Sequence, residues 1–551
     1  MIGINNVKFF DFFASAILKL FTMFSLRFLI PFLSGLLLSL AFPKPGLYFL
    51  AWIALVPLLL NISREGIKNK EAFKEGVVFG LSYFFGTLYW IYHSVHYYGG
   101  MGLVWSILVV IVLSTYLSLY TGTFTFLISL IHKRTHYPLL ITAPSLWVSL
   151  EYIRTYLFTG FPWSSIGYSQ YKMLHLIQIA DITGIYGISF LVVAFNGAIV
   201  DMILLKKRTQ EIPLYPLAPR IAGLFLLILT FIFTFVYGQK RLNQNRPGTD
   251  IRVSIVQGNI PQDKKWDPSF QQEVMNIYEN LTKETVKRDS PVIIIWPETA
   301  VPFIFKEPEN SENLPSRLHN NELLSRKLIK FVKEIKTYLL FGSIRQEYEI
   351  IDPKKPGQEV FTNSAFLLNR DGKVTYIYDK IHLVPFGEYV PLRKLLFFVD
   401  KITIGIGDYR PGKDLKKAIT PFGTFSTLIC YEIIFPNLVR KSIKEGGDFI
   451  VNITNDAWFG KTSGPYQHFS MAVFRAIENR KPIIRAANTG ISGFIDSNGN
   501  ILSASPLFER LSLSMTVKTD NTRTFYSRYG DLFVYFCLLI TICVLSKSLK
   551  I

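Results

Sequence analysis

The sequence contains little of what many enzymes carry, because it has few cysteines, few charged residues and no recognisable cofactor motif. Only three of its 551 residues are cysteine, and only 18% are charged. It has no zinc-spaced Cys/His cluster, no phosphate-binding GxxxxGK[ST] loop, no long internal repeat and no Sec-type cleavage site after an N-terminal apolar segment. These absences argue against a zinc site of that kind, a P-loop nucleotide site and a repeat architecture.

Apolar residues, in contrast, are abundant. They make up half of the chain, and 15% of all residues are aromatic, which is the balance of a membrane protein. The formal net charge is +19, which fits binding to nucleic acid, an anionic bilayer surface or the cytoplasmic loops of a membrane protein. Outside the polar segment 239–530, the basic residues cluster in loops between the apolar segments. We therefore favour the last explanation and predict no nucleic-acid partner.

Eight apolar segments are candidates for membrane spans. They lie at about residues 28–42, 47–61, 77–95, 102–131, 137–158, 183–205, 221–237 and 531–546. A helix needs about 20 apolar residues to cross a bilayer, so the first two and the last are short, and the fourth is long enough to tilt. The N-terminal extension, residues 1–26, is interpreted as an interfacial helix.

Basic residues mark every second loop, and this pattern predicts the orientation of the chain. Lys and Arg are retained on the cytoplasmic side of a membrane. Here they cluster at residues 64–74, 132–134, 206–220 and 547–550, whereas the alternate loops are almost uncharged. The predicted organisation is a transmembrane domain of seven spans at 27–238, an outward-facing domain at 239–530, and an eighth span with a short cytoplasmic tail at 531–551. Lys240 and Arg241 lie on the disfavoured side, which a long translocated domain tolerates.

The fifth span and the loop after it contain residues that need an explanation. Glu151 and Arg154 are three residues apart and share a helix face. Charges at this depth are costly unless they are paired, so we interpret them as a structural pair between helices, with contact to a lipid headgroup as the alternative. The next loop, residues 159–170, is uncharged and aromatic. Trp163 and Tyr168 in this loop are expected at the membrane–water interface.

The outward segment alternates strand-like and helix-like stretches, which predicts a layered α/β domain. Strands are expected at 251–257, 292–296, 338–341, 364–368, 374–378, 422–429, 449–454 and 483–487. Helices are expected after Trp266, with Asp267 as the cap and Pro268 in the first position, and at 322–336 and 468–479. The apolar run 394–406 is either a lid or lipid-dipping loop, or an ordinary buried helix.

The stretch FSTLICYEIIFP, residues 425–436, places Cys430 at the end of an apolar strand. A single cysteine is most often a small buried hydrophobe. Glu298 and Lys380 also follow apolar strands, however, and ligand sites in open α/β sheets gather at the carboxyl ends of strands. A carboxylate can deprotonate a thiol, and an ammonium can stabilise the thiolate and an oxyanion. The three residues together are sufficient for nucleophilic catalysis, although each alone has a structural explanation.

Several motifs resemble known families. IIIWPETAVP, YDKIHLVPFGEYVPL, LICYE and NDAWFGKTSGPYQHFSMAVFRAIENRKPIIRAANTGIS resemble the carbon–nitrogen hydrolase (nitrilase) superfamily, whose triad is Glu, Lys and Cys. LSLYTGTFTF, TGFPWSSIGYSQ, VQGNIPQDKKWD and TFYSRYGD resemble the apolipoprotein N-acyltransferase family more closely. The resemblance covers about residues 27 to 546. It implies a multi-pass α-helical membrane domain joined to a nitrilase-like αββα sandwich.

The resemblance also implies roles for single residues. Glu298 matches the general base, Lys380 the oxyanion stabiliser and Cys430 the nucleophile. The residues that match supporting positions of the family are Glu388, Tyr431, Glu432, Trp266 and Trp458. No metal and no cofactor is implied. This chain has Thr362 before Asn363 where family members often have Tyr, and this departure does not touch the triad.

The implied reaction is acyl transfer in a bacterial inner membrane, with the catalytic domain facing the periplasm. Cys430 would take an acyl chain from a phospholipid, expected to be phosphatidylethanolamine, and pass it to the α-amino group of a diacylglyceryl-cysteine apolipoprotein. Both substrates are lipid-anchored, so a membrane-bound enzyme reaches them without extracting either into water. The alternative is a membrane-anchored amidase that uses the same triad with water as the acceptor. A non-catalytic scaffold is disfavoured by the intact triad.

Overall fold

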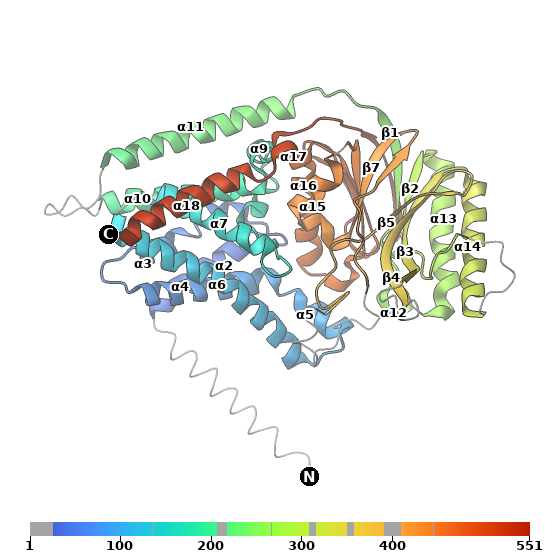
Figure 1. Ribbon diagram of the computed structural model, residues 1–551, viewed down its shortest axis with the longest axis horizontal. Helices are drawn as coiled ribbons and strands as arrows, with labels where there is room; N and C mark the ends of the chain where they lie inside the picture. Colours follow the sequence, from blue (N-terminus) through green and yellow to red (C-terminus); the bar gives the residue numbers. More distant parts are fainter. Residues whose placement is uncertain are drawn as a thin grey trace, which may run out of the picture.

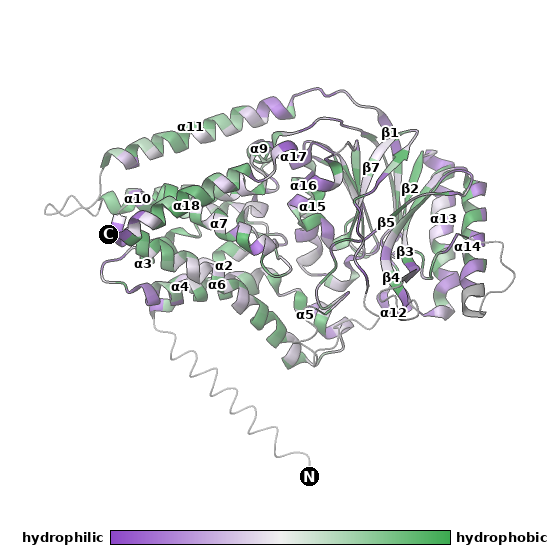
Figure 2. Ribbon diagram, viewed as in Figure 1, coloured by the Kyte–Doolittle hydropathy of each residue, from purple (hydrophilic) through white to green (hydrophobic). Residues whose placement is uncertain are grey.

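The computed structural model of the chain consists of a bundle of apolar helices joined to a layered α/β domain (Figure 1). It describes residues 26–135, 137–206, 217–265, 267–307, 316–349, 358–390, 409–444 and 446–550. Three predictions lie outside these residues, namely the interfacial helix at residues 1–25, the position of Trp266 and the apolar run 394–406. Figure 2 shows that the bundle is mainly hydrophobic, whereas hydrophilic residues are frequent on the helices at the far side of the α/β domain.

The bundle contains helices of very different length. The principal ones are α2 (Leu26–Leu40), α3 (Val56–Ile62), α4 (Asn69–Leu88), α6 (Leu103–Thr135), α7 (Leu139–Tyr156), α10 (Ile185–Lys206), α11 (Leu217–Leu242) and α18 (Leu532–Lys550). Four of them, α6, α10, α11 and α18, are long and apolar enough to cross a membrane. The other expected spans form shorter or less apolar helices, and the count of eight stays a prediction. The segment 47–61 is divided into η1 (Tyr48–Trp52) and α3, and α4 ends at Leu88, before the expected boundary at 95.

Small residues allow α4 and α6 to pack closely. Gly76 and Gly80 of α4 face Thr121 and Thr125 of α6, and a side chain at either glycine would clash with these threonines. The hydroxyl of Thr121 donates a hydrogen bond to the carbonyl of Gly76 at 2.8 Å. Such contacts between small residues are typical of helix packing within membranes, where apolar burial alone does not drive association.

The α/β domain consists of two six-stranded sheets. The first has the order β12-β1-β2-β3-β4-β5, and the second has the order β11-β10-β9-β8-β7-β6. The strands of the first sheet are β1 (Asp250–Gln257), β2 (Ile293–Ile295), β3 (Tyr338–Glu349), β4 (Gln358–Leu368), β5 (Val374–Asp379) and β12 (Leu511–Lys518). Those of the second are β6 (Lys417–Thr420), β7 (Gly423–Ile429), β8 (Phe449–Thr454), β9 (Ile483–Ala487), β10 (Gly493–Ile495) and β11 (Ile501–Ala504). The middle strands β1-β2-β3 and β7-β8-β9 are parallel, so their carboxyl ends share an edge.

Helices cover the outer face of each sheet. α13 (Gln271–Asp289) and α14 (Ser316–Ile335) cover the first sheet, and α15 (Pro436–Ile443) and α16 (Gly464–Asn479) lie between the second sheet and the bundle (Figure 1). The predicted αββα sandwich is confirmed. Its second helical layer is also the contact surface for the membrane part.

All eight predicted strands are present, but β6, β10, β11 and β12 were not predicted. β12 has the sequence LSLSMTVK, whose alternation of apolar and polar residues is itself a strand signal. The expected cap is confirmed, because Asp267 accepts a hydrogen bond from the amide of Ser269 at 2.9 Å. The short helix η4 (Pro268–Phe270) follows this cap and leads into α13.

The expectation that Trp163 and Tyr168 lie at the membrane–water interface is wrong. Each side chain is only 1% exposed, because the loop 159–170 is buried between the bundle and α16. The indole of Trp163 donates to the side-chain carbonyl of Gln467 on α16 at 2.7 Å. The hydroxyl of Tyr168 accepts from Arg475 on the same helix at 2.9 Å.

Glu151 and Arg154 help to fix this loop. The carboxylate of Glu151 accepts a hydrogen bond from the amide of Ile166 at 2.8 Å, and Arg154 donates to the hydroxyl of Ser165 at 3.2 Å. The guanidinium of Arg154 also lies 5.3 Å from the ring centre of Phe84 on α4. These contacts fit the structural interpretation of the two charges, but they connect α7 mainly to the loop 159–170.

Candidate active site

Cys430 lies at a sharp turn where β7 ends and the short helix η5 (Cys430–Ile434) begins. Its φ is +52°, which is the left-handed region, and its side chain is 7% exposed. A residue with a Cβ atom pays about 1–2 kcal/mol for this conformation. The surrounding contacts must therefore hold the turn in place.

Glu432 holds the turn from one side. Its carboxylate accepts hydrogen bonds from the amides of Ile429 at 2.7 Å, Ile381 at 2.7 Å and His382 at 3.1 Å. The hydroxyl of Tyr378 donates to it at 2.9 Å. Burial raises the pKa of Glu432 to about 6, although the hydrogen bonds from the backbone oppose this rise. Glu432 thus connects the turn at Cys430 to the segment that contains Lys380.

Lys380 follows β5 and faces two carboxylates. Its ammonium lies 3.0 Å from the carboxylate of Glu388 and 3.6 Å from that of Glu298. Burial alone would lower the pKa of Lys380, but Glu388, Glu298 and Cys430 together outweigh burial and raise this pKa above its ordinary value. Lys380 is therefore a permanent positive charge in the site.

Asn363 on β4 bridges the two carboxylates. Its amide donates to Glu298 at 2.7 Å and to Glu388 at 3.0 Å. The other oxygen of Glu298 accepts from the backbone amide of Asn455 at 2.8 Å. Sequence periodicity does not predict this role, because Asn363 reaches both carboxylates only when β4 is paired with β5. A polar residue within an apolar strand was the available hint.

A glycine brings Glu298 close to the neighbouring strand. A Cβ atom at Gly342 on β3 would lie 2.7 Å from the Cα atom of Glu298 and would also clash with the amide of Thr299. The amide of Gly342 donates to the carbonyl of Pro297 at 3.1 Å. The position of the Glu298 carboxylate therefore depends on the lack of a side chain at residue 342.

The electrostatic environment keeps the thiol protonated until a base acts on it. Burial raises the pKa of Cys430, and the negative charge of Glu298 raises it further, while Lys380 opposes both. A carboxylate next to a neutral thiol can take its proton during attack, and the fixed ammonium of Lys380 can stabilise the negative charge that develops. The site is suited to nucleophilic acyl chemistry.

Lys265 is a second buried cation that the sequence analysis missed. It is the last residue of α12 (Gln262–Lys265), and its ammonium donates to the backbone carbonyl of Glu298 at 2.9 Å. Burial lowers its pKa to about 8, against the opposing influence of Glu298 and Cys430. The available signal was its place directly before Trp266 in the quoted motif VQGNIPQDKKWD.

The supporting residues do not all lie at the triad. Tyr431 is buried next to Cys430, and its ring is 5.1 Å from that of Phe435. Trp458 in η6 (Asp456–Phe459) lies at the contact with the bundle, where its ring is 5.1 Å from Tyr98 and its carbonyl accepts from Ser94. The position of Trp266 is not among the described residues. Within the described parts of the chain, no group of three or more His, Cys, Asp and Glu side chains is arranged to hold a metal ion.

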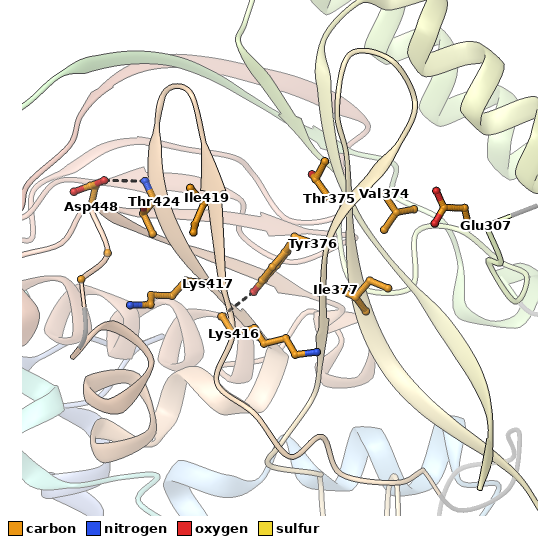
Figure 3. A pocket seen from close by; sticks show the side chains of 12 residues that line it. Glu307, Val374, Thr375, Tyr376, Ile377, Lys416, Lys417, Ile419, Thr424 and Asp448 are labelled. Atoms are coloured by element: carbon orange, nitrogen blue, oxygen red, sulfur yellow. Dashed lines mark hydrogen bonds between the residues drawn. The ribbon is translucent and has the colours of Figure 1, made fainter.

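A separate hollow opens between the edge strands of the two sheets (Figure 3). It has a volume of about 890 Å³, and its lining includes Tyr376, Lys416, Lys417, Ile419 and Asp448. None of the triad residues lines it. This hollow is therefore distinct from the site around Cys430.

The αββα sandwich with a buried Glu, Lys and Cys defines the class as that of the carbon–nitrogen hydrolases. A family model described as carbon-nitrogen hydrolase matches residues 252–525, and one described as apolipoprotein N-acyltransferase N-terminal domain matches residues 34–198. The apolipoprotein N-acyltransferase of Geobacter metallireducens is 44% identical over 513 residues, which are 93% of each chain. That of Pasteurella multocida is 31% identical over 526 residues, which cover 94% of this chain and 93% of the relative. The chain belongs to the apolipoprotein N-acyltransferase family, and it is an acyltransferase with a membrane part.

Solved structures of the nitrilase superfamily are more distant. Nit3 of Saccharomyces cerevisiae is 17% identical, with a TM-score of 0.36, over 50% of this chain and 91% of that chain. An amidase from Nesterenkonia sp. is 18% identical, with a TM-score of 0.36, over 53% of this chain and 97% of that chain.

Proposed function

We propose that this enzyme transfers a fatty acyl chain from a membrane phospholipid, through a thioester on Cys430, to the α-amino group of a diacylglyceryl-cysteine apolipoprotein. The observation that carries the proposal is the convergence of Glu298, Lys380 and Glu388 around Cys430. Membership of the family supports the same reaction.

In the first step, Glu298 takes the proton of the Cys430 thiol while the sulfur attacks the ester carbonyl of the phospholipid. The ammonium of Lys380, held by Glu388, stabilises the oxyanion of the tetrahedral intermediate. The ester C–O bond then breaks, and Glu298 returns the proton to the leaving alkoxide. The products are the Cys430 thioester and a lysophospholipid.

In the second step, the free amine of the diacylglyceryl-cysteine attacks the thioester carbonyl. Glu298 accepts a proton from the attacking nitrogen, the C–S bond breaks, and the sulfur of Cys430 regains a proton. The products are an amide and the free thiol. Amines react readily with thioesters, so the step needs correct placement of the acceptor and exclusion of water more than further activation.

The other predicted residues have supporting roles in this proposal. Glu432 positions the turn of the nucleophile through its hydrogen bonds to Ile429 and Ile381. Tyr431, Trp266 and Trp458 are proposed to shape the surface on which the acyl chain and the acceptor lie. Phosphatidylethanolamine is the proposed donor, through its sn-1 chain. No cofactor takes part in either step.

We propose that the α/β domain, residues 239–530, faces the periplasm of a bacterial inner membrane. α4 supports this orientation because its two ends contact different parts of the molecule. At its first residue, Asn69 accepts a hydrogen bond from Lys133 at 2.7 Å, which joins the basic clusters at 64–74 and 132–134. Near its other end, the carbonyl of Thr87 accepts from Gln467 of the α/β domain at 3.1 Å. The positively charged loops and the α/β domain thus lie at opposite ends of a helix about 30 Å long.

The test is a reaction of the purified enzyme with phosphatidylethanolamine that carries an isotopically labelled sn-1 chain and with a synthetic diacylglyceryl-cysteine peptide. The expected products are labelled N-acyl peptide and lysophospholipid in equal amounts, measured by mass spectrometry. The same peptide with an acetylated α-amino group is the control and should remain unmodified. Release of labelled fatty acid at the same rate with and without the peptide would contradict the proposal and favour hydrolysis.

A further inference from the structure

The backbone of Cys430 is held from a second side by a buried histidine that has no place in the mechanism above. Nε2 of His468 lies 3.2 Å from the carbonyl oxygen of Cys430. This carbonyl belongs to the residue with the left-handed backbone. His468 is on α16 and is fully buried. A hydrogen bond at this carbonyl restricts rotation of the peptide that follows the nucleophile.

The carbonyl of Cys430 requires a proton on Nε2 of His468. A carbonyl oxygen can only accept, so Nε2 must donate. Nη2 of Arg485 lies 2.9 Å from Nδ1 of His468 and donates to the carboxylate of Asp456 at 2.8 Å. Burial lowers the pKa of His468 and the charge of Arg485 lowers it further, while Asp456 opposes both. Nε2 of His468 is therefore a hydrogen-bond donor that points at the carbonyl of Cys430, and Nδ1 lies against Arg485 and Asp456.

Asp456 completes this buried group of side chains. Its carboxylate lies 3.0 Å from Nδ1 of His468 and accepts a hydrogen bond from the hydroxyl of Thr454 at 2.9 Å. Burial would raise the pKa of Asp456, but Arg485 and His468 lower it, so the group remains a carboxylate that balances the charge of Arg485. The arrangement restricts the imidazole ring to one orientation.

The residue before His468 connects the same helix to the membrane part. Gln467 donates to the carbonyls of Pro43 at 3.0 Å and Thr87 at 3.1 Å, and it accepts from the indole of Trp163 at 2.7 Å. The ring of Trp163 also packs against that of His468, with 5.6 Å between their centres. Gln467 thus binds the bundle, and the next residue of α16, His468, binds the backbone of the nucleophile.

We propose that His468 is a positioning residue that keeps the thiol of Cys430 directed at Glu298 and Lys380, and that Gln467 and Trp163 make this position depend on contact with the membrane part. The inference rests on the proposed acyl transfer and adds to it the device that aligns the nucleophile. It also gives the contact between α16 and the bundle a role in catalysis.

The first test compares His468→Gln with His468→Leu in the full-length protein in nanodiscs. The amide of Gln can reach the carbonyl of Cys430 and donate as Nε2 does, whereas Leu cannot. We expect kcat for acyl transfer to fall on the order of 100-fold in His468→Leu with KM little changed, because misplacement of a reacting group by about 1 Å has that effect. His468→Gln should recover to within about tenfold of the wild type.

The second readout is alkylation of Cys430 by iodoacetamide as a function of pH, which requires neither phospholipid nor acceptor. His468→Leu should show an altered pH profile, and His468→Gln a profile like that of the wild type. An unchanged profile and kcat in His468→Leu would overturn the inference. Equal losses in both variants, with melting temperatures like that of the wild type, would also overturn it. If the wild type transfers no acyl group, the proposed function fails, but the alkylation profiles still decide the role of His468.

A third variant tests the inference without a change at His468, in case the His468 variants do not fold. Trp163→Phe keeps a ring next to His468 but removes the indole N–H that binds Gln467. We expect it to shift the alkylation profile of Cys430 in the same direction as His468→Leu, although less strongly. A profile identical to that of the wild type would show that the contact with the membrane part does not affect the position of the nucleophile.

Discussion

The ammonium of Lys380 lies 3.0 Å from the carboxylate of Glu388, and both side chains are largely shielded from solvent. Glu388 also accepts a hydrogen bond from the amide of Val384 at 2.8 Å, so the carboxylate has a fixed position next to the lysine. Glu388 is the strongest of the charges that raise the pKa of Lys380. The relationship explains how a buried lysine remains charged in front of the thiol.

Replacement of Glu388 by Gln should therefore weaken catalysis. We expect kcat for acyl transfer to fall by roughly 100-fold, because Lys380 loses both its main counter-charge and its anchor. The matched control is Glu347→Gln on β3, which removes the exposed partner of Arg345 and should change kcat by less than about twofold. A Glu388→Gln enzyme as active as this control would contradict the role given to Lys380.

The pH dependence of thioester formation should show the titration of the Lys265 ammonium. Its pKa is lowered to about 8, so it is an ammonium below that pH and neutral above it. Above pH 8 the site loses a positive charge near Glu298 and Cys430, and the rate should decline relative to that of Lys265→Arg, which stays charged.

The quantity to measure is the ratio of the Lys265→Arg rate to the wild-type rate at each pH, because titrations shared by both enzymes cancel. We expect this ratio to rise by roughly tenfold as the pH is raised through about 8. Lys264→Arg, at the exposed neighbouring position, should give a constant ratio. A constant ratio for Lys265→Arg as well would show that the charge of Lys265 does not affect thioester formation.

Gly342→Ala tests the placement of Glu298. The added methyl group would lie 2.7 Å from the Cα atom of Glu298, so the loop must move and carry the carboxylate away from Cys430. We expect acyl transfer to fall at least about 100-fold. Gly447→Ala is the control, because its methyl group would make only ordinary contacts, at 3.6 Å or more, and activity should be retained. Full activity in Gly342→Ala would show that Glu298 tolerates displacement.

The orientation can be tested with single cysteines in a protein whose own three cysteines are replaced by alanine. Ile419 in the α/β domain is 83% exposed, and Lys70 is exposed beside the basic loops. In intact spheroplasts, a maleimide that cannot cross membranes should label Ile419→Cys and leave Lys70→Cys unlabelled until lysis. The reverse pattern would place the α/β domain in the cytoplasm.

Much of the fold could be predicted, because local signals agreed with the tertiary structure. The buried strand β2 is a short apolar run, β8 is mostly apolar, and the cap at Asp267 is visible in the sequence. β12 was missed although its alternation was present, since its paired strand β1 lies more than 250 residues earlier in the chain. Membrane boundaries were less predictable, because apolar runs such as residues 47–61 do not show where a helix ends.

Some residues of the candidate site could likewise be predicted from the sequence, and others could not. Glu298, Lys380 and Cys430 follow apolar strands, and strand ends are where ligand sites of α/β sheets gather. Glu298 and Lys380 follow β2 and β5 of the first sheet, whereas Cys430 follows β7 of the second, so the packing of the two sheets brings the three together. The burial of Trp163 was not predictable, because an aromatic residue suits a lipid interface and a protein interior equally well. Asn363 and His468 were missed because each acts on a residue that is remote in the sequence and close only in the folded chain.

In the proposed mechanism, Cys430 carries the acyl chain between the two substrates. The most direct measurement is the intact mass of the purified enzyme after incubation with phospholipid, with Cys430→Ala as the control. We expect a mass increase of one fatty acyl group on the wild type only, which neutral hydroxylamine or a diacylglyceryl-cysteine peptide removes. An unmodified wild-type enzyme that still forms N-acyl peptide, or a fully active Cys430→Ala enzyme, would contradict it.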